Sequence, residues 1–149
     1  MDSNYPSRVR IYEVGPRDGL QNESTAVSTD DKLEYVRLLR AAGLREIEAT
    51  SFVSPRAIPQ LADADDLLAR LLSEDGAGRT RYPVLVPNMR GMARAEAAGA
   101  DSLAVFTAAT DAFTERNIGM TVDQSLEAFR PVLERAAELR WWKRAYVST

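Results

Sequence analysis

Short apolar runs rich in β-branched residues alternate along this chain with segments whose apolar residues recur at helical spacing. The first run, residues 8–14, lies between Pro6 and Gly15 and predicts a strand. Four further runs predict strands at residues 45–50, 82–86, 102–106 and 144–148. The segments between these runs predict helices at residues 28–43, 59–72, 89–98 and 121–137. The chain therefore reads as repeated strand-helix units.

Local signals mark the ends of several of these helices. Ser28 precedes Asp31 by three positions and Thr121 precedes Gln124 by three, the spacing of a capping arrangement at a helix N-terminus. Gly43 follows an Ala-Ala pair, as does the glycine at residue 99, and each leads into a predicted strand, which suits a helix that ends in a left-handed residue. A proline at residue 131 should kink the last helix, because its ring removes a backbone donor.

Strands that alternate with helices predict a parallel sheet, because parallel neighbours need a crossover connection. Two α/β architectures meet this requirement, an open doubly wound sheet and a βα barrel. The first strand is not followed by the Gly-rich G-x-G-x-x-G turn of many doubly wound folds, whereas polar residues follow several strands in turn, as in a barrel. A whole barrel takes roughly 250 residues. We therefore predict a partial TIM (β/α)8 barrel, with about the first four βα units and a fifth strand.

Composition narrows the class of partner. The chain has 149 residues, 45% hydrophobic and 28% charged, which is ordinary for one globular domain. A net charge of −3 disfavours a general nucleic-acid binder and favours a small-molecule partner. Residues 140–144 combine arginine, lysine and tryptophan, and we interpret them as a helix-to-strand turn whose indoles cover the core.

Cysteine usage and hydropathy bear on the compartment. The chain has no cysteine and therefore no disulfide framework, which suits a reducing environment. Its apolar runs fall short of the ~20 residues that a membrane span requires. We expect a cytoplasmic protein that does not engage a membrane.

Polar side chains that could take part in catalysis or binding lie at the predicted strand ends. Arg17 and Asp18 follow the first strand, Glu48 lies in the second, and Tyr146 lies in the fifth. In a barrel these positions meet at one mouth. Glu48 in an otherwise apolar strand needs a partner, because a buried carboxylate is costly alone. Tyr146 suits a site role and a packing role equally, as does Asn88, which could cap a helix.

Three acidic residues cluster near the start of the helix predicted at 59–72. Asp63, Asp65 and Asp66 could suggest a metal site, but acidic side chains at this position also favour the helix dipole. We interpret them as structural.

Several ordered segments together resemble one enzyme family. Residues 14–23 read Val-Gly-Pro-Arg-Asp-Gly-Leu-Gln-Asn-Glu, residues 47–55 read Ile-Glu-Ala-Thr-Ser-Phe-Val-Ser-Pro, and residues 82–88 read Tyr-Pro-Val-Leu-Val-Pro-Asn. These segments, with those at 97–100, 113–118 and 144–148, resemble the hydroxymethylglutaryl-CoA lyases. Related synthases usually carry Thr-Leu-Arg-Asp-Gly-Glu-Gln at the first strand, so the present motif resembles the lyase branch. Colinear motifs are more specific than any single one.

The resemblance implies cleavage of 3-hydroxy-3-methylglutaryl-CoA to acetyl-CoA and acetoacetate with Mg²⁺ or Mn²⁺. It implies that Arg17 stabilises the enolate that forms on the thioester, and that Asp18 is a metal ligand. Glu48 would fix Arg17 or the metal-bound shell. The resemblance also implies four substrate-binding residues. Gln21 would orient the substrate or a metal-bound water, and Asn117 and Tyr146 would contact the substrate or CoA. Thr121 would lie at a helix N-terminus suited to a phosphate or carboxylate.

The sequence departs from the family pattern at its metal site. The family completes that site with a His-x-His pair and an Asn from later strands, and a mobile loop brings a Cys, whereas this chain has no histidine and no cysteine. We expect residues 1–149 to form the N-terminal portion of a lyase-like barrel domain, inactive alone unless a second chain supplies the rest.

Two other hypotheses remain open. One is a non-catalytic half-barrel that acts as a binding or assembly module and forms a homo-oligomer through its unpaired sheet edges. The other is a synthase of the isopropylmalate or homocitrate type, which would share Arg17 and Asp18 but would condense a keto acid with acetyl-CoA. Analysis of the reaction products separates the synthase from the lyase.

Overall fold

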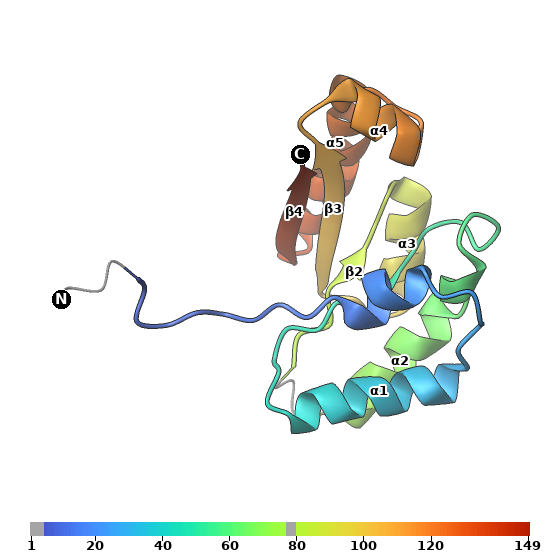
Figure 1. Ribbon diagram of the computed structural model, residues 1–149, viewed down its shortest axis with the longest axis vertical. Helices are drawn as coiled ribbons and strands as arrows, with labels where there is room; N and C mark the ends of the chain where they lie inside the picture. Colours follow the sequence, from blue (N-terminus) through green and yellow to red (C-terminus); the bar gives the residue numbers. More distant parts are fainter. Residues whose placement is uncertain (1–4, 77–79) are drawn as a thin grey trace.

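The computed structural model describes residues 5–76 and 80–149 and contains a four-stranded parallel sheet (Figure 1). Its strands are β1 (Thr50–Ser51), β2 (Val84–Leu85), β3 (Ser102–Ala108) and β4 (Trp142–Ser148). They lie side by side in chain order, and each neighbouring pair is parallel. This is the order in which the strands of a βα barrel follow one another.

Backbone hydrogen bonds extend β1 and β2 beyond their two-residue cores. Ile47 N donates to Arg81 O at 3.1 Å, and Ala49 N donates to Pro83 O at 3.1 Å. Because Pro83 has no N–H of its own, it interrupts the ladder in the other direction. The strands predicted at 45–50 and 82–86 are therefore present, but regular pairing covers only part of each.

The prediction of a strand at residues 8–14 is wrong for most of that segment. Glu13 pairs with the strand beside it, since its N–H donates to Glu46 O at 2.9 Å and its carbonyl accepts from Glu48 N at 2.8 Å. Before Glu13 the backbone is extended without such pairing among the described residues. Val9 and Ile11 are 75% and 61% exposed, so their β propensity has no neighbouring strand to act on.

Five α-helices among the described residues connect and cover the strands. They are α1 (Thr29–Ala41), α2 (Ala64–Glu74), α3 (Met89–Ala97), α4 (Asp111–Ile118) and α5 (Val122–Glu138). The helix predicted at 59–72 begins later, after a separate 3₁₀ turn at Pro59–Leu61. Helix α4 was not predicted, because Thr114 is its only buried residue and no apolar face marks it in the sequence. The predicted helix with an internal proline is present, and α5 continues through Pro131.

The hydrophobic core lies between the sheet and the helices that cover its outer face. It includes Leu33 and Val36 of α1, Leu67, Leu68 and Leu71 of α2, Met92 of α3, and Phe129 and Val132 of α5. Trp141 belongs to this core, while its neighbour Trp142 points to the opposite face of the sheet, as alternation along a strand requires. The interpretation of the two indoles as core cover therefore holds for Trp141 and is wrong for Trp142.

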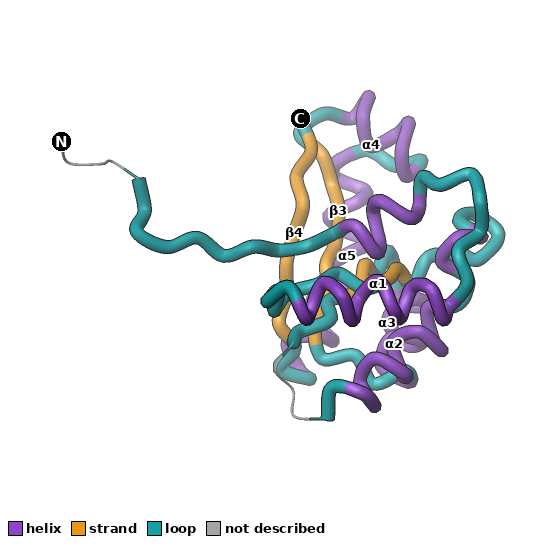
Figure 2. Tube along the Cα trace, turned by 60° about the horizontal axis from the view of Figure 1, so that its bottom comes forward, coloured by secondary structure: helices purple, strands orange, loops and turns teal. Residues whose placement is uncertain are grey.

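The sheet is strongly curved. The ring of Tyr12, which precedes the Glu13 pairing, lies 5.9 Å from that of Trp142 and 6.4 Å from that of Tyr146. In a flat sheet the four intervening strand spacings would separate these positions by roughly 19 Å. Figures 1 and 2 show the extended N-terminal segment passing beside β3 and β4. The prediction of a partial barrel wall is thus confirmed.

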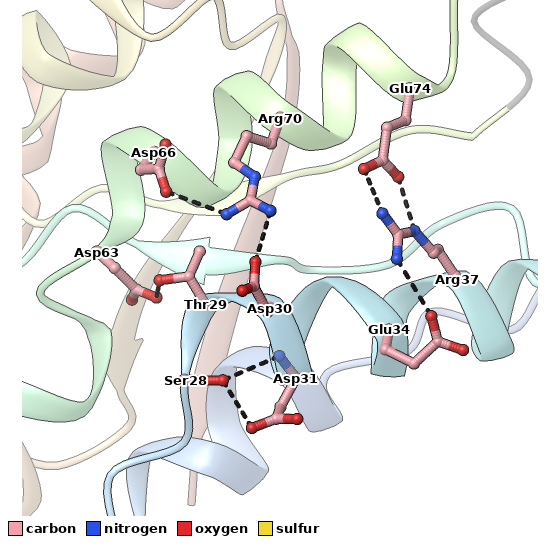
Figure 3. Close-up of polar contacts among 10 residues, drawn as sticks. All are labelled: Ser28, Thr29, Asp30, Asp31, Glu34, Arg37, Asp63, Asp66, Arg70 and Glu74. Atoms are coloured by element: carbon pink, nitrogen blue, oxygen red, sulfur yellow. Dashed lines mark hydrogen bonds and ion pairs between the residues drawn. The ribbon is translucent and has the colours of Figure 1, made fainter.

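Ion pairs fasten α1 to α2 (Figure 3). Arg37 donates through Nη2 and Nε to the carboxylate of Glu74, at 2.6 and 2.9 Å. Arg70 reaches back to Asp30 at 2.6 Å. The predicted cap is also present, with Asp31 N donating to Ser28 Oγ at 3.2 Å.

The acidic cluster before and within α2 is structural, as interpreted. Asp63 accepts from Thr29 Oγ1 at 2.7 Å and from the buried Lys32 Nζ at 2.6 Å. Asp65 pairs with Arg94, and Asp66 with Arg70. Over residues 5–76 and 80–149, the helices include none with both the length and the apolar character of a membrane span.

Candidate active site

Arg17 is carried by a single π-helical turn, Gly15–Gly19, that follows the Glu13 pairing. A Cβ on Gly15 would lie 2.4 Å from Tyr35 Oη and 2.8 Å from Glu13 Oε1, so the turn needs glycine for this close approach. Gly15 N donates to that same Glu13 oxygen at 2.6 Å. Single π turns of this kind are frequent at functional sites. The turn leaves Arg17 only 8% exposed.

Glu48 is the buried centre of the site. Glu48 is fully buried, and both of its carboxylate oxygens accept hydrogen bonds. Arg17 Nε donates to Oε1 at 2.5 Å. Tyr12 Oη and Tyr146 Oη both donate to Oε2, each at 2.6 Å. The partner that the sequence demanded for Glu48 is therefore present, and it comes with two hydroxyl donors from the N-terminal segment and β4.

The charges of this network are fixed by their surroundings. Burial lowers the pKa of Arg17, but the attraction and hydrogen bond of Glu48 outweigh it, so the pKa is raised overall. Burial, with Glu48 as the second cause, raises the pKa of Tyr146 to about 12 and that of Tyr12 further. Arg17 is thus a cation, and both tyrosines are protonated donors, at neutral pH.

Arg17 keeps donor capacity for a ligand. Its Nη1 donates to Asp18 Oδ1 at 2.7 Å, and the Asp18 side chain is 54% exposed. Nη2 has no hydrogen-bond partner within the described part of the chain. An immobilised guanidinium with a free donor can stabilise an oxygen on which negative charge develops.

Asp18 does not make a metal site by itself. Among residues 5–76 and 80–149, no group of three or more His, Cys, Asp or Glu residues is arranged to hold a metal ion. Mg²⁺ and similar cations require several oxygen ligands in near-octahedral geometry. Asp18 offers one exposed carboxylate, so the described residues do not fit a complete Mg²⁺ or Mn²⁺ site.

The structure brings four of the predicted site residues together: Arg17, Asp18, Glu48 and Tyr146. Gln21 is half-buried, just past the π turn. The amide of Asn117 donates to Phe113 O within α4 at 2.8 Å. Thr121 caps α5 in the predicted box with Gln124. The substrate-binding roles of Gln21, Asn117 and Thr121 remain predictions.

Asn88 and Thr107 have structural partners. Asn88 Oδ1 accepts from Gly91 N at 3.0 Å and caps α3, so the predicted cap is present, while its site role stays a prediction. Thr107 Oγ1 shares a buried hydrogen bond of 2.7 Å with Ser125 Oγ of α5.

Sequence reasoning missed three residues around Glu48. Tyr12 donates to it, Trp142 stacks on the Tyr12 ring, and the Arg144 guanidinium carbon lies 4.1 Å from the centre of that ring. The available signal for Tyr12 was its place in an apolar segment that leads directly to Arg17 and Asp18. The contact of Tyr12 with β4 depends on the curvature of the sheet, which no local sequence pattern indicates.

Comparison with known proteins identifies the family of the chain. The sequence profile described as HMGL-like matches residues 8–141. The chain is 45% identical over 146 residues to the cytoplasmic 3-hydroxy-3-methylglutaryl-CoA lyase of Rattus norvegicus, covering 98% of this chain and 42% of that protein.

Two solved structures share the fold. The hydroxymethylglutaryl-CoA lyase of Pseudomonas aeruginosa matches with a TM-score of 0.88 and 43% identity, over 95% of this chain and 46% of that one. An HMG-CoA lyase of Acinetobacter baumannii, solved with coenzyme A and 3-methylmalate, matches with a TM-score of 0.83 and 35% identity, over 93% and 44%. The chain spans less than half the length of these relatives. With a family profile that matches most of its residues, the chain belongs to the HMGL-like family.

Proposed function

We propose that this chain carries the enolate-stabilising part of a hydroxymethylglutaryl-CoA lyase, which cleaves 3-hydroxy-3-methylglutaryl-CoA to acetyl-CoA and acetoacetate. The observation that carries the proposal is the buried Arg17–Glu48 pair, whose Nε–Oε1 distance is 2.5 Å. The similarity to lyases of rat and Pseudomonas aeruginosa supports it.

Arg17 acts where charge develops. Loss of the proton from the C3 hydroxyl lets C3 become the ketone of acetoacetate, while the electron pair of the C2–C3 bond moves to C2 and forms the acetyl-CoA enolate. The negative charge of that enolate lies largely on the thioester oxygen, which would accept from the free Nη2 of Arg17. A base takes the hydroxyl proton and an acid returns one proton to C2, which releases acetyl-CoA; neither of these two groups is assigned to a described residue. Because Glu48 fixes the guanidinium in advance, no reorganisation is needed at the moment of bond cleavage.

Asp18 is the residue that we assign as a ligand of Mg²⁺ or Mn²⁺. Such an ion, when bound, would hold the substrate hydroxyl and carboxylate. The described residues offer no further ligand cluster, so the role derived above for this chain is that of Arg17, held by Glu48. Gln21 is proposed to orient the substrate near Asp18.

The substrate is proposed to be an acyl-CoA thioester. The Acinetobacter baumannii relative was solved with coenzyme A, which supports this class of ligand. We assign Tyr146, Asn117 and Thr121 as contacts to the substrate or to its CoA portion. A cytoplasmic location is proposed, supported by the cytoplasmic rat relative.

The test uses a hybrid enzyme, made by joining residues 1–149 to the part of the Pseudomonas aeruginosa lyase outside the matched region. The hybrid is expected to release acetyl-CoA and acetoacetate from 3-hydroxy-3-methylglutaryl-CoA in the presence of Mn²⁺, measured by mass spectrometry. The 149-residue chain alone is expected to show little or no release. A folded hybrid without cleavage, beside an active Pseudomonas aeruginosa enzyme, would overturn the proposal. Condensation of a keto acid with acetyl-CoA instead would assign the synthase reaction.

A further inference from the structure

We propose that Tyr12 is a positioning residue, which together with Tyr146 clamps one oxygen of Glu48 so that the other faces Arg17. This inference rests on the proposed function for its catalytic meaning. The clamp itself rests on geometry alone. No role for Tyr12 was evident from the sequence motifs.

The hydrogen-bond donors divide between the two carboxylate oxygens of Glu48. Tyr12 and Tyr146 both donate to Oε2 at 2.6 Å, and Arg17 Nε donates to Oε1 at 2.5 Å. Three donors from three separate segments fix the carboxylate plane. A rotation of the carboxylate would stretch the hydrogen bonds from both tyrosine hydroxyls at once. Because Glu48 is fully buried, water cannot replace these hydrogen bonds.

Tyr12 is itself held by side chains. Its ring stacks on Trp142 with an interplanar angle of 26° and a centroid distance of 5.9 Å. The Arg144 guanidinium lies 4.1 Å from the Tyr12 ring centre and 4.9 Å from that of Tyr146. Backbone pairing of this segment begins only at Glu13. The hydroxyl of Tyr12 is therefore placed by its contacts with β4.

The consequence concerns Arg17. Without the Tyr12 hydroxyl, Oε2 keeps a single donor and the carboxylate can turn, which loosens the Oε1 bond to Arg17 Nε. The guanidinium would then be less well aimed at the developing enolate. Such a change affects the bond-breaking step more than substrate binding, so kcat should fall while KM stays.

The test is the Nε–H signal of Arg17 in ¹⁵N-labelled 149-residue chain, measured by NMR in Tyr12→Phe. The substitution keeps the ring and removes only the hydroxyl. We expect the signal to shift and its hydrogen exchange with water to speed up about tenfold, with the circular dichroism spectrum unchanged. Tyr82→Phe is the matched control, because the Tyr82 hydroxyl is also buried but does not contact Glu48, and it should leave the signal in place.

Two results would overturn the clamp. One is an Arg17 signal in Tyr12→Phe that matches the unsubstituted chain in position and exchange rate. The other is an Arg17 Nε–H that exchanges too fast to observe in the unsubstituted chain, because a clamped group is protected.

The hybrid enzyme adds the catalytic readout. There Tyr12→Phe should lower kcat about tenfold with KM within about twofold, and Tyr82→Phe should change neither. An unchanged kcat would show that Tyr12 does not position the reaction. A hybrid that fails to cleave even unsubstituted would count against the proposed function alone, since the NMR result decides the clamp separately.

Discussion

Two glutamates on one strand form arginine pairs of very different character. Glu46 and Glu48 are two positions apart and so face the same side of the sheet. Glu46 accepts from Arg81 at 2.6 Å and lies 3.3 Å from Arg10. The side chain of Arg81 is 37% exposed and that of Arg10 is 74% exposed. Glu48 accepts from Arg17, whose side chain is 10% exposed, and from two tyrosine hydroxyls.

An arginine–glutamate pair alone therefore does not mark a site. Glu46 itself is only 6% exposed, but its two arginines are partly exposed, so water and salt screen the attraction and side-chain freedom opposes it. The Glu48 pair is enclosed, so the position and charge of Arg17 are both fixed. The enclosed pair lies toward the C-terminal ends of the strands, the end at which TIM barrels carry out their chemistry. The open pair lies toward the N-terminal ends, where residues commonly serve stability.

The largest expected effect on stability is at Glu48. Glu48→Gln leaves Arg17 buried without its main counter-charge and should lower the free energy of unfolding by about 3 kcal/mol. Glu46 is also buried, but Glu46→Gln leaves behind two arginines that water can reach, so it should lower the free energy of unfolding by no more than about 1 kcal/mol. Urea unfolding followed by circular dichroism measures both. Equal losses in the two variants would remove the contrast between the two pairs.

A smaller effect appears at alkaline pH. The pKa of Tyr146 is raised to about 12 by burial and by Glu48, against the ordinary tyrosine pKa of 10.0 in the unfolded chain. The folded state therefore holds this proton more tightly, so the stability it contributes is complete below pH 10 and is lost as pH rises toward 12. Tyr146→Phe should reduce that loss, as measured by urea unfolding across this range. A Tyr146 that titrates with the unfolded chain, followed by tyrosinate absorbance, would show that the enclosure of Glu48 is incomplete.

Local signals in the sequence predicted local features well. The caps at Ser28 and Thr121 depend on groups three residues apart, and both are present. Gly43 and Gly99 have φ of 98° and 86°, the left-handed conformation that their place after a helix indicated. Glu48 was identified because a carboxylate in an apolar strand needs a partner, which is a requirement that sequence alone reveals.

Features set by long-range geometry could not be predicted in this way. Tyr12 meets Trp142 because the sheet curves, and curvature is a property of all its strands together. Pairing at residues 8–12 depends on a neighbouring strand rather than on the β propensity of Val9 or Ile11. Helix α4 lacks an apolar stripe, so periodicity had nothing to detect.

The most direct test of the account compares Arg17→Ala with Arg81→Ala in the hybrid enzyme. Each substitution removes the arginine from one of the two glutamate pairs. Arg17→Ala should lower kcat for cleavage of 3-hydroxy-3-methylglutaryl-CoA by about 10³-fold, a loss of about 4 kcal/mol of transition-state stabilisation. Arg81→Ala should leave kcat within about twofold, because Arg81 pairs with Glu46 and reaches the site through the Trp142 ring rather than through Glu48. Retention of kcat in Arg17→Ala, or an equal loss in both variants, would contradict the claim that the enclosed arginine stabilises the enolate.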